Sequence, residues 1–314
     1  MKKIIIDTDP GMDDAVAIMF ALRSKQFDLR AITTVSGNLT ADRCAVNARR
    51  ILEFLDATHI PVARGLQHPL ERPYPRDPFS HGDDGLANLG LPQPTMPEDA
   101  RSAADLIVQT VAQHAGDISI LCIGPLTNIA LALALDPRLP LKVTELIAVA
   151  GAYRFDVASS LPATGDNPVS EWNVYVDPEA ADIVFRAGFN LTAIGLDVAT
   201  QEAIHIGEEH RARLQASKRK EAWFLKGVVD FVEQRGFRSY CALIDALAVA
   251  AALDPTIFAT EEVRVGIETK GLLTLGQTVV DRRQHFAWTD LPRVRVAYAV
   301  EANRFLGLLL DALT

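Results

Sequence analysis

Four aspartates fall within eight residues near the start of the chain, in the segment Asp7-Thr8-Asp9-Pro10-Gly11-Met12-Asp13-Asp14. Carboxylates held this close repel one another, and each raises the pKa of its neighbours unless a cation or a helix amino terminus compensates. Asp9 and Asp14 can share a hard cation through oxygen ligands, which suits calcium or magnesium. A solvated turn with a helix cap explains one or two of these acids but not four. The segment therefore predicts a divalent-cation site.

Other polar residues have both an ordinary and a functional interpretation. Asp245 lies in an apolar stretch, where a lone carboxylate is costly unless it is paired or bound to a metal. Asn38 follows a glycine and could be a turn residue, and Thr127 could be the N-cap of a helix. Glu171 and Asn173 lie two residues apart, which would place both on one face of an extended segment.

Short β-branched runs that predict strands alternate with patterns that predict helices. Strands are predicted at 4–6, 29–35, 60–63, 118–123, 146–149, 191–196, 263–267, 279–280 and 294–300. Helices are predicted from about residue 14, over 40–55, from about residue 99, after 125, from 178, through most of 207–253 and at the carboxyl end. The stretch 65–97 contains seven prolines and predicts a long loop, which is usually functional or flexible.

This alternation predicts an α/β fold, an open and mainly parallel (Rossmann-like) sheet with helices on both faces. Ligands of such sheets bind beyond the carboxyl ends of the strands, so the active site is predicted at that edge. The acidic segment directly follows the first predicted strand and would lie there. No internal repeat and no linker poor in apolar residues divides the sequence. We therefore predict a single domain over residues 1–314.

The composition narrows the class of protein. Hydrophobic residues make up 49% and charged residues 23% of the chain, which is typical of a globular protein. The formal net charge of -9 argues against a nucleic acid or an anionic membrane as the main partner. The three cysteines lie far apart in apolar segments and are expected to be buried thiols. Since no segment resembles a signal peptide or a membrane span, we expect a cytoplasmic enzyme.

Read through Ala15, the acidic segment resembles the amino-terminal signature of the inosine–uridine-preferring nucleoside hydrolases. Further segments match that family in its order: Gly37-Asn38, His81-Gly82-Asp83-Asp84-Gly85-Leu86, Gly124-Pro125-Leu126-Thr127-Asn128-Ile129-Ala130, Glu171-Trp172-Asn173 and Asp245-Ala246-Leu247-Ala248. These matches span most of the chain. The resemblance implies an open α/β sheet with a calcium ion at its carboxyl edge, a ribonucleoside as the small-molecule substrate, and a homodimer or homotetramer.

The resemblance also implies roles for individual residues. The calcium ligands would be Asp9, Asp14, Asp245 and the backbone carbonyl of Thr127, all of them oxygen donors. Asp13 would be the general base for a water that the cation also holds. That water would attack C1′ of the ribose opposite the base, through an oxocarbenium-like state and with inversion. The products would be free base and ribose.

The implied substrate contacts are to the sugar. Asn38 and Asn173 would hydrogen-bond the ribose, and Glu171 would bind its 5′-hydroxyl, so that binding energy orients the reacting carbon. Asn167 is a candidate stand-in for a family asparagine, because an ungapped match places Gly165 at that position.

The part of the site expected to handle the base departs from the family. Many members carry a histidine just before the aspartate that matches Asp245, where it is proposed to protonate the leaving base, and others carry tryptophan. This chain has Ile244, which cannot donate a proton. His81, in the proline-rich loop, is the remaining candidate for this role, since histidine titrates near neutral pH. Candidates for lining the base pocket are Phe79, Trp223 and Tyr240.

Two other function classes stay open from the sequence. Phosphatases of the haloacid-dehalogenase type also begin with a strand followed by Asp-x-Asp, which would make Asp7 a nucleophile with Asp9 beside it. The continuation to Asp14 and the later motifs do not fit that class. An inactive relative that binds nucleoside is compatible with Ile244, although Asp13 is retained.

Overall fold

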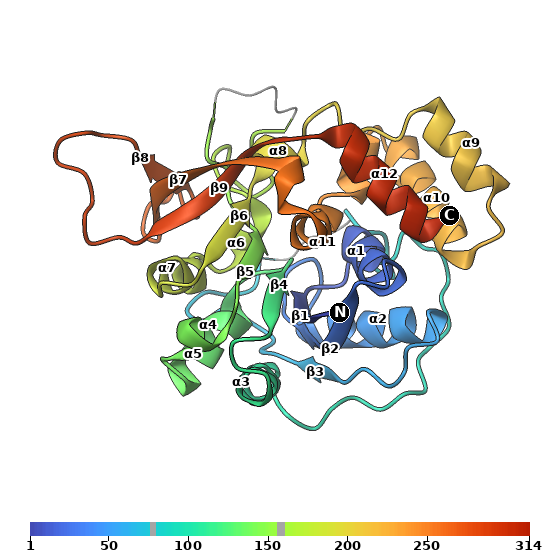
Figure 1. Ribbon diagram of the computed structural model, residues 1–314, viewed down its shortest axis with the longest axis horizontal. Coiled ribbons are helices and arrows are strands. Elements are labelled where there is room, and N and C mark those ends of the chain that lie inside the picture. Colours follow the sequence, from blue (N-terminus) through green and yellow to red (C-terminus); the bar gives the residue numbers. More distant parts are fainter. Residues whose placement is uncertain (76–79, 156–160) are drawn as a thin grey trace.

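In the computed structural model, which describes residues 1–75, 80–155 and 161–314, the strands form one twisted sheet (Figure 1). Its order is β3-β2-β1-β4-β5-β6-β9-β7-β8. The strands are β1 (Lys2–Thr8), β2 (Phe27–Thr34), β3 (Val62–Arg64), β4 (Ser119–Cys122), β5 (Leu146–Val149), β6 (Leu191–Ile194), β7 (Phe258–Ile267), β8 (Thr278–Asp281) and β9 (Arg293–Val300). Among these strands only β7 runs in the opposite direction, and it pairs antiparallel with β8 and β9, whereas all other pairs are parallel. The predicted open, mainly parallel sheet is confirmed.

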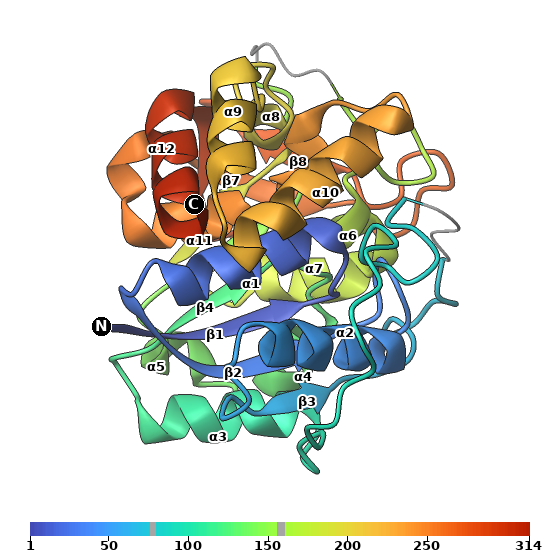
Figure 2. The ribbon, with the colours of Figure 1, turned by 90° about the vertical axis from the view of Figure 1, so that its right-hand side faces the viewer.

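Helices cover both faces of the sheet (Figure 2). One face carries α1 (Met12–Arg23), α2 (Ala41–Phe54), α10 (Lys220–Gln234), α11 (Ala246–Leu253) and α12 (Ala302–Leu313). The other carries α3 (Ala103–Gln113), α4 (Thr127–Leu135) and α7 (Pro178–Arg186). Shorter elements are α5 (Leu139–Lys142), α6 (Trp172–Val176), α8 (Leu196–Ala199), α9 (Glu208–Ala216) and two 3-10 turns, η1 (Ser239–Ala242) and η2 (Pro255–Ile257).

The first strand shows why the sheet needs helices on both faces. Successive side chains of a strand point to opposite faces. Ile4 and Ile6 accordingly pack into the core under α1 and α11, whereas Ile5 packs into the core under α3 and α4. All three are fully buried. A continuous apolar run of this kind is stable only where both faces of the strand are covered.

Two predicted boundaries differ from the observed ones for local reasons. The helix expected from about residue 99 begins at Ala103, because the Ser102 side chain accepts from the Asp105 amide and fixes the start there. The strand expected over 191–196 ends at Ile194. Gly195 follows as the N-cap of α8.

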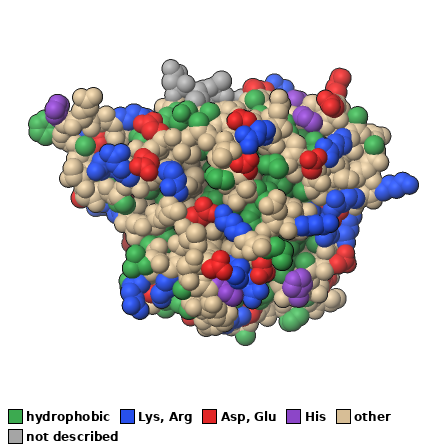
Figure 3. Space-filling view, viewed as in Figure 1, with side chains coloured by type: hydrophobic (Ala, Val, Ile, Leu, Met, Phe, Trp, Pro, Cys, Tyr) green, Lys and Arg blue, Asp and Glu red, His purple; other side chains and the backbone are tan. Residues whose placement is uncertain are grey.

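The strands β7 and β8 belong to an arm that projects from the body of the molecule (Figure 1). Its connecting loops expose Leu272, Leu273 and Phe286 almost fully. On the face shown in Figure 3, basic and acidic side chains are interspersed. Among the described residues, no helix combines the length and the apolar character that crossing a bilayer requires.

Candidate active site

The polar residues singled out in the sequence gather where the strand order reverses. The chain passes from β1 outward to β2 and β3, then returns to β4 on the other side of β1. Parallel sheets bind ligands at the carboxyl edge of such a point. A cavity of about 380 Å³ lies there. The polar residues that line it are Asp13, Asn38, Ser80, His81, Thr164, Asp166, Glu171, Asn173, Cys241 and Asp245.

Three buried carboxylates converge here, and two of them, Asp13 and Asp245, line the cavity. Asp13, Asp14 and Asp245 each offer one oxygen, and these oxygens all lie within 4.8 Å of one another. Burial first, and then the charge of Asp13, raises the pKa of Asp14 to about 6. Burial, followed by the charges of Asp13 and Asp14, raises the pKa of Asp245 well above its usual range. The amino-terminal ends of α1 and α11 thus hold three like charges together.

Asp9 lies behind this cluster and is enclosed by backbone. Its Oδ2 accepts from the Asn38 amide at 2.6 Å, whereas Oδ1 is buried with no hydrogen-bond partner among the described residues. A Cβ atom at Gly37 would lie only 2.0 Å from Asp9 Oδ2, so glycine is required there. Burial, with the charge of Asp14 as a second cause, raises the pKa of Asp9 well above its usual range.

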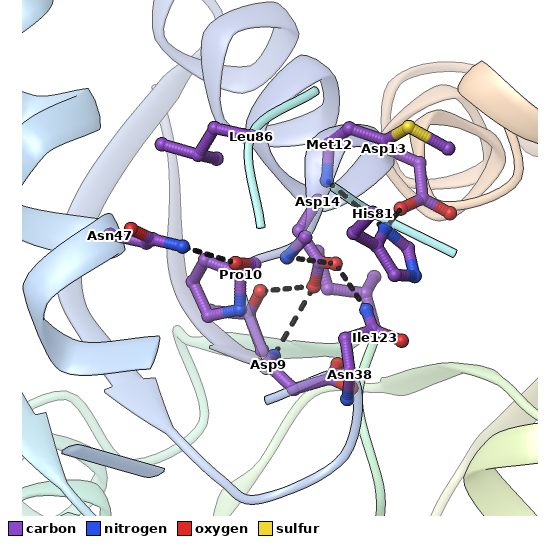
Figure 4. Close-up of polar contacts among 12 residues, drawn as sticks. Asp9, Pro10, Met12, Asp13, Asp14, Asn38, Asn47, His81, Leu86 and Ile123 are labelled. Carbon is purple, nitrogen blue, oxygen red and sulfur yellow. Dashed lines mark hydrogen bonds and ion pairs between the residues drawn. The ribbon is translucent and has the colours of Figure 1, made fainter. Parts of the chain in front are cut away.

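Asp14 is fixed by donors from the turn that precedes α1 (Figure 4). Its carboxylate accepts from the Thr8 hydroxyl, from the Gly11 amide at 2.9 Å and from Asn38 Nδ2 at 3.1 Å. Asn38 therefore bridges Asp9 and Asp14 with its backbone and side chain. This turn-bridging role adds to the substrate contact that the resemblance implies.

His81 lies against Asp13 on the cavity wall (Figure 4). Its Nδ1 accepts from the Met12 amide at 3.3 Å and lies 3.6 Å from Asp13 Oδ1. When Nδ1 accepts, the neutral ring carries its proton on Nε2. A Cβ atom at Gly11 would lie 2.4 Å from His81 Nδ1, so this approach depends on glycine. The structure thus brings the loop histidine to the general-base candidate.

Glu171 and Asn173 also line the cavity, but not from an extended segment. Glu171 is the N-cap of α6, and its carboxylate accepts from the amides of Gly151, Asn173 and Val174. Asn173 lies in the first turn, where Nδ2 donates to the carbonyls of Ile123 and Val149. The extended conformation predicted for this pair is wrong, because the Glu171 carboxylate caps the amides of Asn173 and Val174 and so favours a helix.

The cluster has the features of a cation site. Its side-chain ligand atoms are carboxylate oxygens, and one buried Asp9 oxygen has no partner among the described residues. Burial and then mutual repulsion raise the pKa values of these carboxyls. A divalent cation would relieve each of these costs, and hard cations prefer oxygen ligands. The group that converges includes Asp13, whereas the resemblance assigns Asp9, Asp14 and Asp245 as ligands.

Two site residues predicted from sequence lie elsewhere. Thr127 is the first residue of α4, with Leu126 as N-cap, and its hydroxyl donates to Asp177 at 2.6 Å. Its cap interpretation is therefore wrong. Among the described lining residues, Ile123 is present and Thr127 is not.

Asn167 holds its own loop together instead of lining the cavity. Its Oδ1 accepts from the amides of Val169 and Ser170, and its Nδ2 donates to the Leu275 carbonyl at 2.8 Å. The adjacent Asp166 lines the cavity. Asp166 was not predicted as a site residue, because a single acid in a loop is not distinguished by sequence from a solvated surface residue.

The aromatic candidates for the base pocket are not supported. Trp223 is half exposed and packs against Phe54 and Phe224. Tyr240 is buried but absent from the described lining residues, and Phe79 lies outside the described residues. The apolar lining comes instead from Met12, Ile123, Val149, Leu161, Ala163, Trp172, Leu196, Val232, Phe237 and Ile244.

Asp7 cannot act as the nucleophile that a phosphatase would need. It is fully buried, and its carboxylate accepts from Thr33 at 2.6 Å and from Asn128 at 2.8 Å. Burial is the main reason that its pKa rises to about 6. Asp7 instead joins β1 to β2 and α4, and the haloacid-dehalogenase alternative is not supported.

An open, mainly parallel sheet with a carboxylate-rich cavity at its switch point is the arrangement of an α/β enzyme for a small polar substrate. Comparison with known proteins identifies the group of enzymes. The chain belongs to the inosine-uridine preferring nucleoside hydrolase family, whose model matches residues 4–307. The resemblance noted in the sequence is confirmed over nearly the whole chain.

The chain is similar to known proteins over nearly their full length. It is 37% identical to an inosine-uridine preferring nucleoside hydrolase of Leishmania major, with 99% of this chain and 97% of the relative covered. It is 36% identical to the pyrimidine-specific ribonucleoside hydrolase RihA of Shigella flexneri, with the same coverage. The solved plant nucleoside hydrolase PpNRh1 superposes with a TM-score of 0.89 at 33% identity, covering 100% of this chain and 99% of that one.

Proposed function

We propose that this protein hydrolyses the N-glycosidic bond of ribonucleosides and releases free base and ribose. The observation that carries this proposal is the convergence of Asp13, Asp14 and Asp245 at one end of a cavity that Asn38, Asn173 and Glu171 also line. Carboxylates can bind a cation and activate water, and amides beside them can hold sugar hydroxyls. The inactive alternative has no structural support, since Asp13 lines the cavity.

Asp13 is the proposed general base. It takes a proton from the water that attacks C1′, while Asn38, Asn173 and Glu171 hold the ribose in position. Attack in one step inverts the configuration at C1′. His81, with a proton on Nε2, is the proposed donor to the departing base, because it lines the same cavity beside Asp13. Ile244 contributes apolar contact only.

We propose calcium as the cation. Bound there, it would lower the pKa of the attacking water and offset the repulsion among the carboxylates. Asp9, Asp14 and Asp245 are the proposed side-chain ligands. For a backbone ligand we favour the carbonyl of Ile123 over that of Thr127, since Ile123 lines the cavity.

A substrate panel tests this function. Ribonucleosides and 2′-deoxyribonucleosides are assayed for released reducing sugar, with calcium and with chelator. Turnover of ribonucleosides that chelator abolishes and calcium restores is expected. Deoxyribonucleosides should be poor substrates, because they lack a hydroxyl that can reach the cation. Turnover of a phosphomonoester without nucleoside turnover would contradict the proposal.

We further infer nucleoside catabolism and base salvage in the cytoplasm as the setting, and a homodimer or homotetramer as the working form. The free, buried thiols of Cys44 and Cys122 suit a reducing compartment. The apolar side chains exposed on the arm suit contact with another subunit. Light scattering on the purified protein measures the assembly directly, and a monomer would contradict it.

A further inference from the structure

The loop 164–170 contributes to one wall of the cavity, and hydrogen bonds join its two ends. The amides of Thr164 and Gly165 both donate to the Ser170 carbonyl at 3.0 Å. The Thr164 hydroxyl accepts from the Trp172 amide at 2.7 Å, which joins the loop to the start of α6. Asn167 ties the loop to Leu275. A loop fixed at this many points holds its side chains in defined positions.

Asp166 is the side chain of this loop that places a charge in the cavity. It lines the cavity and remains exposed to solvent, unlike Asp13 and Asp245. Burial raises the pKa of the Tyr175 hydroxyl, and the nearby negative charge of Asp166 raises it further. Tyr175 in turn stacks on Trp172, another lining residue. The carboxylate therefore lies beside the aromatic residues of α6, on a loop whose backbone is fixed.

The charges facing this wall are mostly negative. Glu171 adjoins the same loop, and its carboxylate accepts only from backbone amides among the described residues. The described lining residues include no lysine or arginine. Two cations lie near the loop but are engaged outside the cavity. Arg72 pairs with Glu179, and Arg154 donates to the Pro168 carbonyl.

We propose that Asp166 is a specificity-determining residue that makes this site reject ribosides with a negative charge at the 5′ position and favour neutral or cationic ones. This inference rests on the proposed function, in which Glu171 binds the 5′-hydroxyl and so directs that end of the sugar to this wall. Two carboxylates beside a 5′-phosphate repel it, whereas they attract a 5′-ammonium group. The exposure of Asp166 means that dissolved salt screens the effect.

Three substrates that differ in charge at one position test the proposal. They are uridine, 5′-amino-5′-deoxyuridine and uridine 5′-monophosphate, with 5′-O-methyluridine as a neutral control for size. The variant Asp166→Asn keeps the shape of the side chain but removes its charge. Its kcat/KM for the amine relative to uridine should fall by about threefold to tenfold at low ionic strength. The ratio for the monophosphate, measured as turnover or as competitive inhibition, should rise by a similar factor.

Two further variants complete the test. Asp166→Ser should behave like Asp166→Asn, which guards against a local effect of the amide. Asp311→Asn removes an exposed carboxylate on α12 that pairs with Arg213, and should leave both ratios as in the wild type. Unchanged ratios in both Asp166 variants, or equal changes in Asp311→Asn, would overturn the inference. Failure of the wild type to cleave uridine would instead count against the proposed function, so the two failures are distinguishable.

Discussion

Asp13 and Asp14 are adjacent in sequence but have different surroundings. Asp14 accepts hydrogen bonds from Thr8 and Gly11 before α1 and from Asn38 after β2. Asp13 instead lines the cavity and lies 3.6 Å from His81 Nδ1. A ligand needs a fixed position, whereas a general base needs access to the reacting water. The hydrogen bonds therefore distinguish Asp14, the proposed ligand, from Asp13, the proposed base, although the two residues are adjacent in sequence.

The variant Asp13→Asn tests this separation. It keeps the shape of the side chain but cannot accept a proton, so kcat should fall by about 10²- to 10⁴-fold. Calcium binding, measured by calorimetry, should persist. The matched variant Asp14→Asn should lose calcium binding as well as turnover. If Asp13→Asn loses calcium too, Asp13 is a ligand, and the base must be sought elsewhere.

The proposed role of His81 as proton donor is tested with substrates that differ in their leaving group. The variant His81→Ala should slow the hydrolysis of inosine and uridine, whose bases need a proton to depart. It should leave p-nitrophenyl riboside nearly unaffected, because that leaving group needs none. Loss of ribose binding would slow all three substrates alike, so steady-state kinetics with both kinds of leaving group separates the causes. Equal rates for variant and wild type on every substrate would remove His81 from the mechanism.

At the scale of elements, Asp177 connects three segments around the site. One oxygen accepts from the Ala180 amide and caps α7. The other accepts from the Thr127 hydroxyl at the start of α4 and from the Leu70 amide in the proline-rich stretch. Asp177 is fully buried. A single carboxylate thus fixes where α4, α7 and the root of the long loop meet.

Replacing Asp177 by alanine should lower the free energy of unfolding by about 2–5 kcal/mol. The loss combines a helix cap with two buried donors left without partners. A thermal unfolding experiment should show this as a lower Tm. The control is Asp182→Ala on the same helix, where a partly exposed pair with Arg186 is removed. That change should cost about 0.5 kcal/mol or less. Equal costs for the two variants would contradict the role assigned to Asp177.

At the scale of the whole molecule, the acidic cluster links stability to pH and calcium. Burial and mutual repulsion raise the pKa of Asp14 to about 6 and raise the pKa values of Asp9 and Asp245 well above their usual range. Without a cation, the folded chain therefore holds protons that the unfolded chain releases from about pH 4 upward. The contribution of these groups to stability is present below that pH and is lost as pH rises through the folded pKa values.

Calcium should oppose this loss, because it binds the deprotonated carboxylates. The increase in Tm that calcium produces should be larger at pH 8 than at pH 5. Saturation at a hundred times Kd would add about 2.7 kcal/mol to the free energy of unfolding. Thermal unfolding with calcium and with chelator at both pH values measures this difference. An equal increase in Tm at pH 5 and pH 8 would contradict a calcium site formed by carboxyls with raised pKa values.

We also propose that residues 1–314 unfold as one domain. The observed sheet joins strands from both ends of the chain, since β9 pairs with β6 and β1 pairs with β4. Differential scanning calorimetry should give one transition, with calorimetric and van't Hoff enthalpies that agree. Two resolved transitions would show separate folding units.

Local patterns in the sequence determined much of this protein. The β-branched run at Ile4–Ile6 indicated a doubly covered strand because the side-chain period of a strand is fixed by its geometry. The four aspartates after it indicated a cation site because their repulsion needs compensation wherever they lie. Asp245 was identified because an acid in an apolar helix is costly without a partner.

Only the tertiary structure decided how distant segments meet. It placed His81 beside Asp13 and Asp166 on the cavity wall. It also showed that Thr127 binds Asp177 and that Asn167 binds the Leu275 carbonyl. Each of these positions depends on hydrogen bonds between residues far apart in the chain, such as Asn167 to Leu275. Periodicity and turn chemistry act over a few residues, so they cannot fix contacts across a hundred. Those contacts form only when the sheet brings its loops to the same edge.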